Sequence, residues 1–234
     1  MEAQRPGAIP GARLSRGLSM PSGVETVTDP PGKGSTVQRA ALLPTLRRGA
    51  HHMRMAAPTY YTADMVRALP DDGNRYEVVH GELHVTPAPR LWHQEIVKRL
   101  LTRLEGYLER EPIGLVLPSP ADISWAEDIL VQPDVFVVPL DEARTLQWSK
   151  IRHLLLAIEV LSPSSTRADR FTKRRLYQEQ GVPLYWMVDA DARVVEAWTG
   201  DARFPALERE CLTWLPPGAS QPFTLALSEL FRDL

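Results

Sequence analysis

An apolar run with a single charge is the feature of this sequence that most constrains the fold. The run covers residues 154–161, and Glu159 is its only charged residue. A run this short and this rich in Leu, Ile and Val predicts a buried strand. An unpaired buried carboxylate costs several kcal/mol or is neutralised by a raised pKa, so Glu159 needs a partner. The sequence leaves open whether that partner is a metal ion, an arginine, or solvent at the edge of a sheet.

Helical and β-like patterns alternate around this strand. Apolar residues at helical spacing predict a long helix over residues 92–110. A second helix is predicted from Thr166, which with Asp169 resembles a capping box, to Gly181. The further β-like runs are residues 114–117, 121–125, 134–138, 184–188 and 193–198. The upstream elements are a short helix that begins at residue 62 and hairpin strands at residues 75–79 and 83–86. This order predicts an α/β fold with a mixed central β-sheet flanked by helices and an N-terminal helix-hairpin addition.

Residues 1–57 differ in composition from the rest of the 234-residue chain. They are rich in Pro, Gly, Ser and Arg and show no sustained period of 2 or 3.6, which predicts a disordered N-terminal extension. A targeting peptide and a DNA-binding arm are alternatives. Because Met53 and Met55 directly precede the first regular pattern, we favour a start site placed too far upstream. Residues 58–234 are predicted to form one globular domain.

Composition and charge exclude several classes of protein. The single cysteine, Cys211, cannot form an intramolecular disulfide or a cysteine-rich zinc site, which favours a reducing cytoplasm. No apolar run approaches the roughly 20 residues of a membrane span. The absence of a G-x-S-x-G elbow, a Gly-rich phosphate loop and a zinc-spaced His pair excludes a serine hydrolase and an NTPase, and no organic cofactor is expected.

The charge distribution limits how this chain would bind DNA. Residues 1–54 carry eight Lys/Arg and three Asp/Glu, which leaves 19 basic and 26 acidic residues in the rest of the chain. An acidic domain is a poor general nucleic-acid binder, because neutralisation of phosphates supplies most non-specific affinity. Any function on DNA therefore depends on local basic patches.

Two acids are candidates for a metal site. Asp134 begins an apolar strand, just as Glu159 lies within another. Alone, Asp134 is typical of a turn or cap residue after proline. On neighbouring strands, however, the two carboxylates would project from one face of the sheet. Two carboxylate oxygens, a backbone carbonyl and waters are suitable ligands for Mg²⁺ or Mn²⁺.

Lys173 is the candidate cation beside these acids, because it lies in the helix that follows the Glu159 strand. There it could orient the attacking water and stabilise charge in the transition state. The nearby basic residues that could bind nucleic-acid phosphates are Arg167, Arg170 and Arg174. A solvated helix face is the alternative interpretation of this cluster.

Three further residues are secondary candidates. Glu77 lies in the first hairpin strand, and Glu82 directly precedes the second. His93 lies at the start of the long helix, on the face that leads to its apolar residues. A core or capping histidine is the alternative interpretation for His93.

Several short motifs together resemble one family. They are residues 75–83 (RYEVVHGEL), His93-Gln94, residues 132–134 (QPD), residues 159–164 (EVLSPS), the spacing from Asp169 to Lys173, and residues 181–189 (GVPLYWMVD). Each motif is weak alone, but the set resembles the Uma-type restriction endonucleases of the PD-(D/E)xK nuclease superfamily over residues 58–234.

The resemblance implies a restriction-endonuclease-like core in which Asp134 and Glu159 bind a divalent metal. The superfamily lysine position, two residues after the second acid, is Leu161 here, and Lys173 takes its place on the following helix. Glu77 corresponds to an acid near the metal. Two departures from the family pattern are His80 and Leu184.

We therefore expect a Mg²⁺- or Mn²⁺-dependent endonuclease that hydrolyses DNA phosphodiester bonds. Asp134 and Glu159 would hold the metal with the Val160 carbonyl, Lys173 would activate the water, and Glu77 would assist. A homodimer would suit this function, because cleavage of both strands often uses two sites, although no interface signal in the sequence decides it. The alternatives are a catalytically silent nucleic-acid-binding or interaction module on the same fold, and a metal-dependent hydrolase of another phosphate ester.

Overall fold

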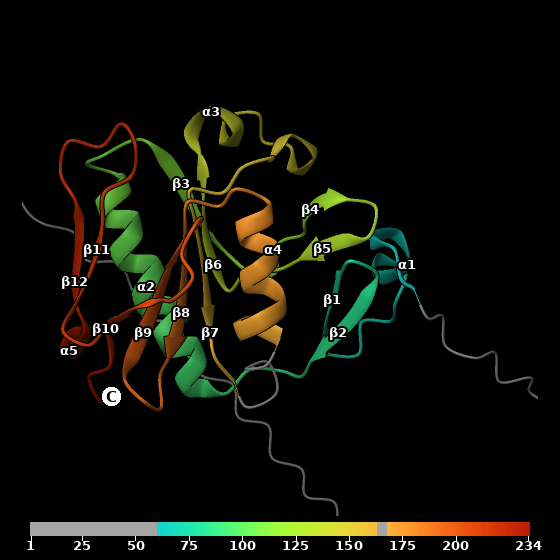
Figure 1. Ribbon diagram of the computed structural model, residues 1–234, viewed down its shortest axis with the longest axis horizontal. Coiled ribbons are helices and arrows are strands. Elements are labelled where there is room, and N and C mark those ends of the chain that lie inside the picture. Colours follow the sequence, from blue (N-terminus) through green and yellow to red (C-terminus); the bar gives the residue numbers. More distant parts are fainter. Residues whose placement is uncertain (1–59, 163–167) are drawn as a thin grey trace, which may run out of the picture. The chain divides into compact units, whose positions relative to one another are not determined.

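The computed structural model describes residues 60–162 and 168–234 (Figure 1). The predicted N-terminal extension, the two candidate start residues and the start of the predicted capping box at Thr166 lie outside these ranges.

A six-stranded sheet with the order β10-β9-β8-β7-β6-β3 forms the centre of the domain. Its strands are β3 (Gly114–Pro118), β6 (Val135–Pro139), β7 (Leu156–Val160), β8 (Leu184–Asp189), β9 (Val194–Thr199) and β10 (Ala206–Glu208). Only β7 and β8 pair in parallel; the other neighbours are antiparallel. The mixed central sheet predicted from the sequence is therefore confirmed.

A parallel pair needs a crossover connection, because the chain must return to the same end of the sheet. The π-helix η2 (Ala168–Lys173) and helix α4 (Arg174–Glu179), which continue directly into one another, form the described part of the crossover between β7 and β8. Gly181 follows α4 at φ +70°, a left-handed conformation that ends helices and favours glycine.

Helices cover both faces of the central sheet (Figure 1). One face packs against α2 (Leu91–Leu108), whose buried residues follow the helical spacing seen in the sequence. The hairpin of β11 (Cys211–Trp214) and β12 (Phe223–Ala226), with α5 (Leu227–Leu230), completes this core. The opposite face packs against α4 through Leu176 and Tyr177. Segments that are far apart in the sequence therefore cover the two faces of the central sheet, and both faces are mainly apolar.

A second, four-stranded sheet has the order β2-β1-β5-β4. Its elements, with the short helix beside them, are α1 (Ala63–Arg67), β1 (Arg75–Val79), β2 (Glu82–Thr86), β4 (Ile123–Ala126) and β5 (Ile129–Val131). The predicted helix-hairpin addition is thus present. The expectation that residues 121–125 join the central sheet is wrong, because β4 pairs with β5, a three-residue strand that the sequence pattern did not reveal.

The β1–β2 turn explains why the hairpin forms where the sequence indicated it. His80 and Gly81 adopt φ values of 49° and 79°. Two consecutive residues at positive φ are typical of the tight turns that match the twist of antiparallel strands. Val79 then packs with β4, β5 and the α4 face of the central sheet in one cluster, which fixes the second sheet against the domain.

Two short elements, α3 (Leu140–Ala143) and the 3₁₀-helix η1 (Trp148–Lys150), connect β6 to β7. Within residues 60–162 and 168–234, none of the helices has the length and apolar character that crossing a membrane requires.

Candidate active site

Strands β6 and β7 bring the two predicted acids together. Val135 pairs with Ile158, and the same antiparallel register continued by one residue sets Asp134 opposite Glu159. Directly opposed residues of antiparallel strands project from the same face of a sheet. Both side chains are buried, with exposed fractions of 4% for Asp134 and 0% for Glu159. The juxtaposition expected from the sequence is therefore present in the fold.

Lys173 lies at the centre of the buried charges. Its Nζ is 2.7 Å from Glu77 Oε2, 3.0 Å from Glu159 Oε1 and 3.4 Å from Asp169 Oδ1. The side chain is only 1% exposed, so Lys173 does not belong to a solvated helix face. Burial by itself would lower the pKa of Lys173, but the surrounding carboxylates outweigh burial and hold this pKa above its usual value. The lysine is therefore a charged donor.

The π-helix explains how two charged residues of one segment reach this cluster. Asp169 and Lys173 are separated by one turn, and both are buried while Phe171 between them is exposed. A π-helix is rare and occurs often at functional sites. Here it directs the carboxylate of Asp169 and the ammonium of Lys173 toward Glu159.

Glu159 has different environments at its two oxygens. Its Oε1 accepts hydrogen bonds from Lys173 and, at 3.0 Å, from the hydroxyl of Tyr177. Its Oε2 is buried and has no hydrogen-bond partner among the described residues. Burial raises the pKa of Glu159 well above its usual value. The positive charge of Lys173 lowers this pKa only in part, and the negative charge of nearby carboxylates such as Asp134 raises it further.

Asp134 is held by three donors. Arg75 Nη1 is 2.6 Å from Oδ1, and Oδ2 lies 3.1 Å from His93 Nε2 and accepts the backbone N–H of Val160 at 2.8 Å. Burial opposes ionisation, but the hydrogen bond from His93 and the charge of Arg75 hold the pKa of Asp134 below its usual range. Asp134 is thus an ionised carboxylate even though it is buried.

Glu77 links the second sheet to this cluster. It is 1% exposed, its Oε1 accepts the backbone N–H of Gln132 at 2.7 Å, and its Oε2 faces Lys173. Arg75 lies two residues earlier in β1 and therefore projects from the same face of that strand. The hairpin predicted from the sequence thus supplies one acid and one cation to the site.

Glu159 is the acid of the site whose charge the protein compensates least, because burial holds its pKa well above its usual value. A divalent cation beside Glu159 would favour the ionised carboxylate. The partnerless Oε2 of Glu159 is the atom that most needs such a ligand, and one or two carboxylates with waters commonly suffice for Mg²⁺. Across the described ranges, no three His, Cys, Asp or Glu side chains already converge as metal ligands.

A cavity of about 790 Å³ reaches this site from one side. Its lining includes Arg75, His93, Asp134 and Ser162 but not Glu159, Glu77 or Lys173. Asp134 therefore faces the cavity, and the other acids with the lysine lie behind it.

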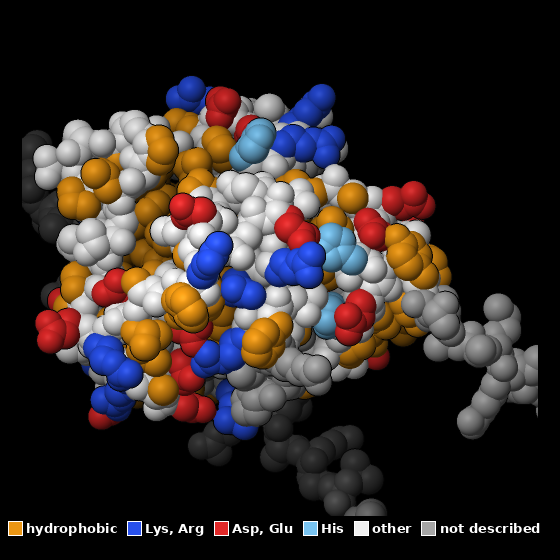
Figure 2. All heavy atoms as spheres, in the orientation of Figure 1, with side chains coloured by type: hydrophobic (Ala, Val, Ile, Leu, Met, Phe, Trp, Pro, Cys, Tyr) orange, Lys and Arg blue, Asp and Glu red, His pale blue; other side chains and the backbone are white. Residues whose placement is uncertain are grey.

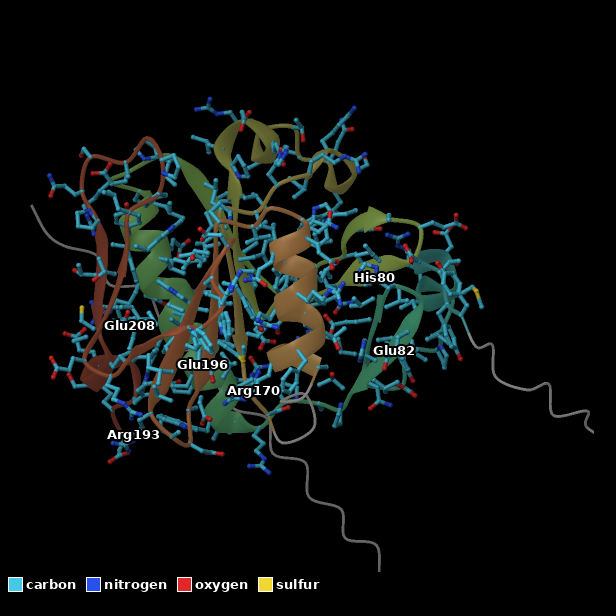
Figure 3. The ribbon with its side chains drawn as sticks, viewed as in Figure 1. His80, Glu82, Arg170, Arg193, Glu196 and Glu208 are labelled. Atoms are coloured by element: carbon cyan, nitrogen blue, oxygen red, sulfur yellow. The ribbon has the colours of Figure 1, made fainter. Side chains whose placement is uncertain are left out.

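The remaining predicted residues lie elsewhere or already have partners. Glu82 is exposed in the β1–β2 hairpin, away from Arg170 and Glu196 (Figure 3). Arg170 forms ion pairs with Glu196 and Asp189. Arg174 lies over the ring of Trp198, with its Cζ 4.5 Å from the ring centroid. Arg167 lies outside the described residues, and the nucleic-acid-binding role of the three arginines stays a prediction.

The face that carries α4 has charges of both signs. Figure 2 shows Lys and Arg side chains on this face interspersed with Asp, Glu and His. A surface of this kind offers little long-range attraction for a polyanion, in line with the acidic composition of residues 55–234.

Sequence reasoning missed three residues of the cluster. Arg75 and Asp169 could have been found, because each lies at strand or helix spacing from a candidate: Arg75 two residues before Glu77, and Asp169 four residues before Lys173. Tyr177 lies four residues after Lys173, but an aromatic at that spacing is indistinguishable from an ordinary core residue in the sequence.

The protein is of the mixed α/β class, with a buried acid-lysine cluster between its two sheets and the crossover helix. A crystal structure described as "a putative nuclease belonging to DUF820 from Anabaena variabilis ATCC 29413" has the same fold, with a TM-score of 0.60 and 22% sequence identity. The match covers 73% of this chain and 97% of that one.

The family follows from the sequence match. The model of the Uma2 family, described as "Putative restriction endonuclease", matches residues 63–227. The chain therefore belongs to the Uma2 family, as the resemblance of its motifs implied. Comparison with curated proteins gives no match.

Proposed function

We propose that this domain is a metal-dependent endonuclease that hydrolyses phosphodiester bonds in DNA. The observation that carries the proposal is the position of Lys173, a charged lysine buried against Glu159 directly behind the cavity-facing Asp134. Burial of this many charges is costly for stability and is therefore typical of a functional site.

Asp134 and Glu159 would hold the metal, which we expect to be Mg²⁺ or Mn²⁺. These ions prefer hard oxygen ligands, and the partnerless oxygen of the buried Glu159 favours a divalent cation. The Val160 carbonyl is the proposed third protein ligand. When bound, such an ion polarises the phosphate and lowers the pKa of its water.

The protein's own residues would position and stabilise the reacting groups. Because the pKa of Lys173 is raised, the ammonium keeps its proton, so it would orient the attacking water and stabilise negative charge rather than act as a base. Glu77 accepts from Lys173 and keeps the ammonium in place. Arg75 and His93 orient Asp134 at the wall of the cavity.

One observation favours a second candidate, a catalytically silent binding module. Both oxygens of Asp134 already accept hydrogen bonds, from Arg75 at Oδ1 and from His93 and Val160 at Oδ2. In this arrangement, hydrogen bonds from the protein itself already stabilise the negative charge of Asp134. A metal that binds Asp134 would have to displace at least one of these donors.

The test is nicking of supercoiled DNA by the full chain in Mg²⁺, Mn²⁺ or EDTA. We expect metal-dependent nicking that falls by about 100-fold or more in Glu159→Gln and Asp134→Asn. The matched control is Glu105→Gln, an exposed acid on α2, which should retain the wild-type rate. Equal nicking by wild type and both site variants, or no nicking by a folded wild type that binds metal, would favour the binding module. Light scattering of the same samples would test the proposed homodimer.

A further inference from the structure

The cavity in front of Asp134 lies between the two sheets of the domain. One wall comes from α1 and the turn before β1, with Arg75 and Tyr76 of β1. The other comes from α2 and the segments that carry Ser119 and Asp134. Its volume of about 790 Å³ falls within the range of about 300–1,000 Å³ found for pockets that enclose small ligands. Asp134 thus lies in the wall of a half-open cavity rather than on a flat face of the molecule.

The charges of the lining do not favour a paired duplex. Its three arginines are matched by three aspartates: Arg67, Arg75 and Arg90 against Asp71, Asp122 and Asp134. Arg67 is paired with Asp122, and Arg75 with Asp134. Duplex binding depends mainly on neutralisation of many phosphates, and this lining leaves few positive charges for it. Affinity must therefore come from contacts other than backbone charge.

The remaining lining is suited to a nucleobase. Tyr76 and the prolines of the segment before α2 supply flat apolar surfaces, and unpaired bases stack on such surfaces without regard to sequence. The amide of Gln94 can donate to and accept from a base edge. Gln94 and Arg90 have no side-chain partner among the described residues, so Arg90 remains for a single phosphate.

We propose that the substrate is DNA with unpaired nucleotides, a single strand or an opened region, and that one such nucleotide enters this cavity beside the bond to be cut. This inference rests on the proposed function. A group that is recessed in a cavity is reached more readily by a single strand or by an extruded nucleotide than by a paired duplex. The position of Asp134 in the cavity wall therefore favours a substrate with unpaired nucleotides.

The test uses one labelled DNA sequence in three forms: single-stranded, paired with a central mismatched bubble, and fully paired. We expect the single strand and the bubble to be cut at least about tenfold faster than the duplex in Mn²⁺.

Ala88→Trp would fill the cavity from its exposed proline-rich wall without touching the acids. It should lower kcat/KM on the single strand by about tenfold or more. Ala206→Trp, an exposed position on β10 outside the cavity, is the matched control and should retain the wild-type value.

The outcomes separate this inference from the proposed function. If the duplex is cut as fast as the single strand in a metal-dependent reaction, the inference is overturned but the proposed nuclease function still holds. If no form is cut above the Glu159→Gln background, the proposed function fails. Fluorescence anisotropy with the same DNA then decides the inference: a preference for the single strand that Ala88→Trp removes supports it, and equal binding of all three forms overturns it.

Discussion

Replacement of Lys173 by methionine is the perturbation whose cost follows most directly from the structure. Methionine retains the size and the unbranched shape of the side chain but removes the charge. The ammonium lies 2.7, 3.0 and 3.4 Å from oxygens of Glu77, Glu159 and Asp169. Removal of one partner of a buried ion pair costs about 3–5 kcal/mol, because the other charge is left buried and unpaired. With three carboxylates affected, we expect a loss of about 4–5 kcal/mol in the free energy of unfolding at neutral pH.

The pH dependence gives this prediction a second, independent part. The folded-state pKa of Lys173 is raised, so the stability that the lysine contributes is fully present below its ordinary pKa and is lost only as the pH rises through the folded-state value. In Lys173→Met the pKa of Glu159, already raised, would rise further. A buried carboxyl group with a raised pKa destabilises the fold when it is ionised, and this cost is lost as the pH falls from its folded-state pKa toward its unfolded-state pKa. The free energy of unfolding of Lys173→Met should therefore approach that of wild type as the pH falls toward about 5.

The assay is urea unfolding of wild type and Lys173→Met with EDTA, at pH 7.5 and pH 5. The matched control is Lys98→Met, an exposed lysine on α2 that pairs with Glu95, for which we expect a loss of about 1 kcal/mol or less. A loss in Lys173→Met as small as that of the control, or a loss that does not shrink at pH 5, would refute the electrostatic reasoning.

Three further predictions concern the site and the hairpin. Tyr177→Phe removes one donor to Glu159 Oε1 and should cost about 1–2 kcal/mol in urea unfolding; an unchanged midpoint would contradict a role for this hydroxyl. Mn²⁺ at about 100 times its Kd should stabilise wild type by roughly 2.7 kcal/mol, and the matching rise in Tm should be absent from Glu159→Gln. Gly81→Ala should destabilise more than Gly73→Ala. Both glycines have positive φ, but a Cβ at Gly81 would lie 2.2 Å from a ring carbon of Tyr60, whereas at Gly73 it would meet nothing within 4 Å. Equal unfolding midpoints for these two variants would show that the contact with Tyr60 is unimportant.

The sequence by itself determined the elements whose signals are local. The apolar run around Glu159 became β7, the helical spacing after residue 91 became α2, and the His80-Gly81 pair became a tight turn. These features depend on the spacing of apolar side chains and on the backbone preferences of a few neighbouring residues. They therefore form in any fold that buries the apolar face. The same locality made Asp134 and Glu159 visible as single acids in apolar strands.

Only the tertiary structure decided how these elements combine. Strand pairing is non-local, so no pattern within residues 121–125 could show that β4 joins the hairpin sheet through β5. Whether Lys173 faces solvent or lies 1% exposed among carboxylates depends equally on what packs against its helix. Arg75 and Tyr177 entered the cluster for the same reason, because each meets its partner from more than 15 residues away in the chain. A residue's type is local, whereas its charge environment is a property of the packed fold.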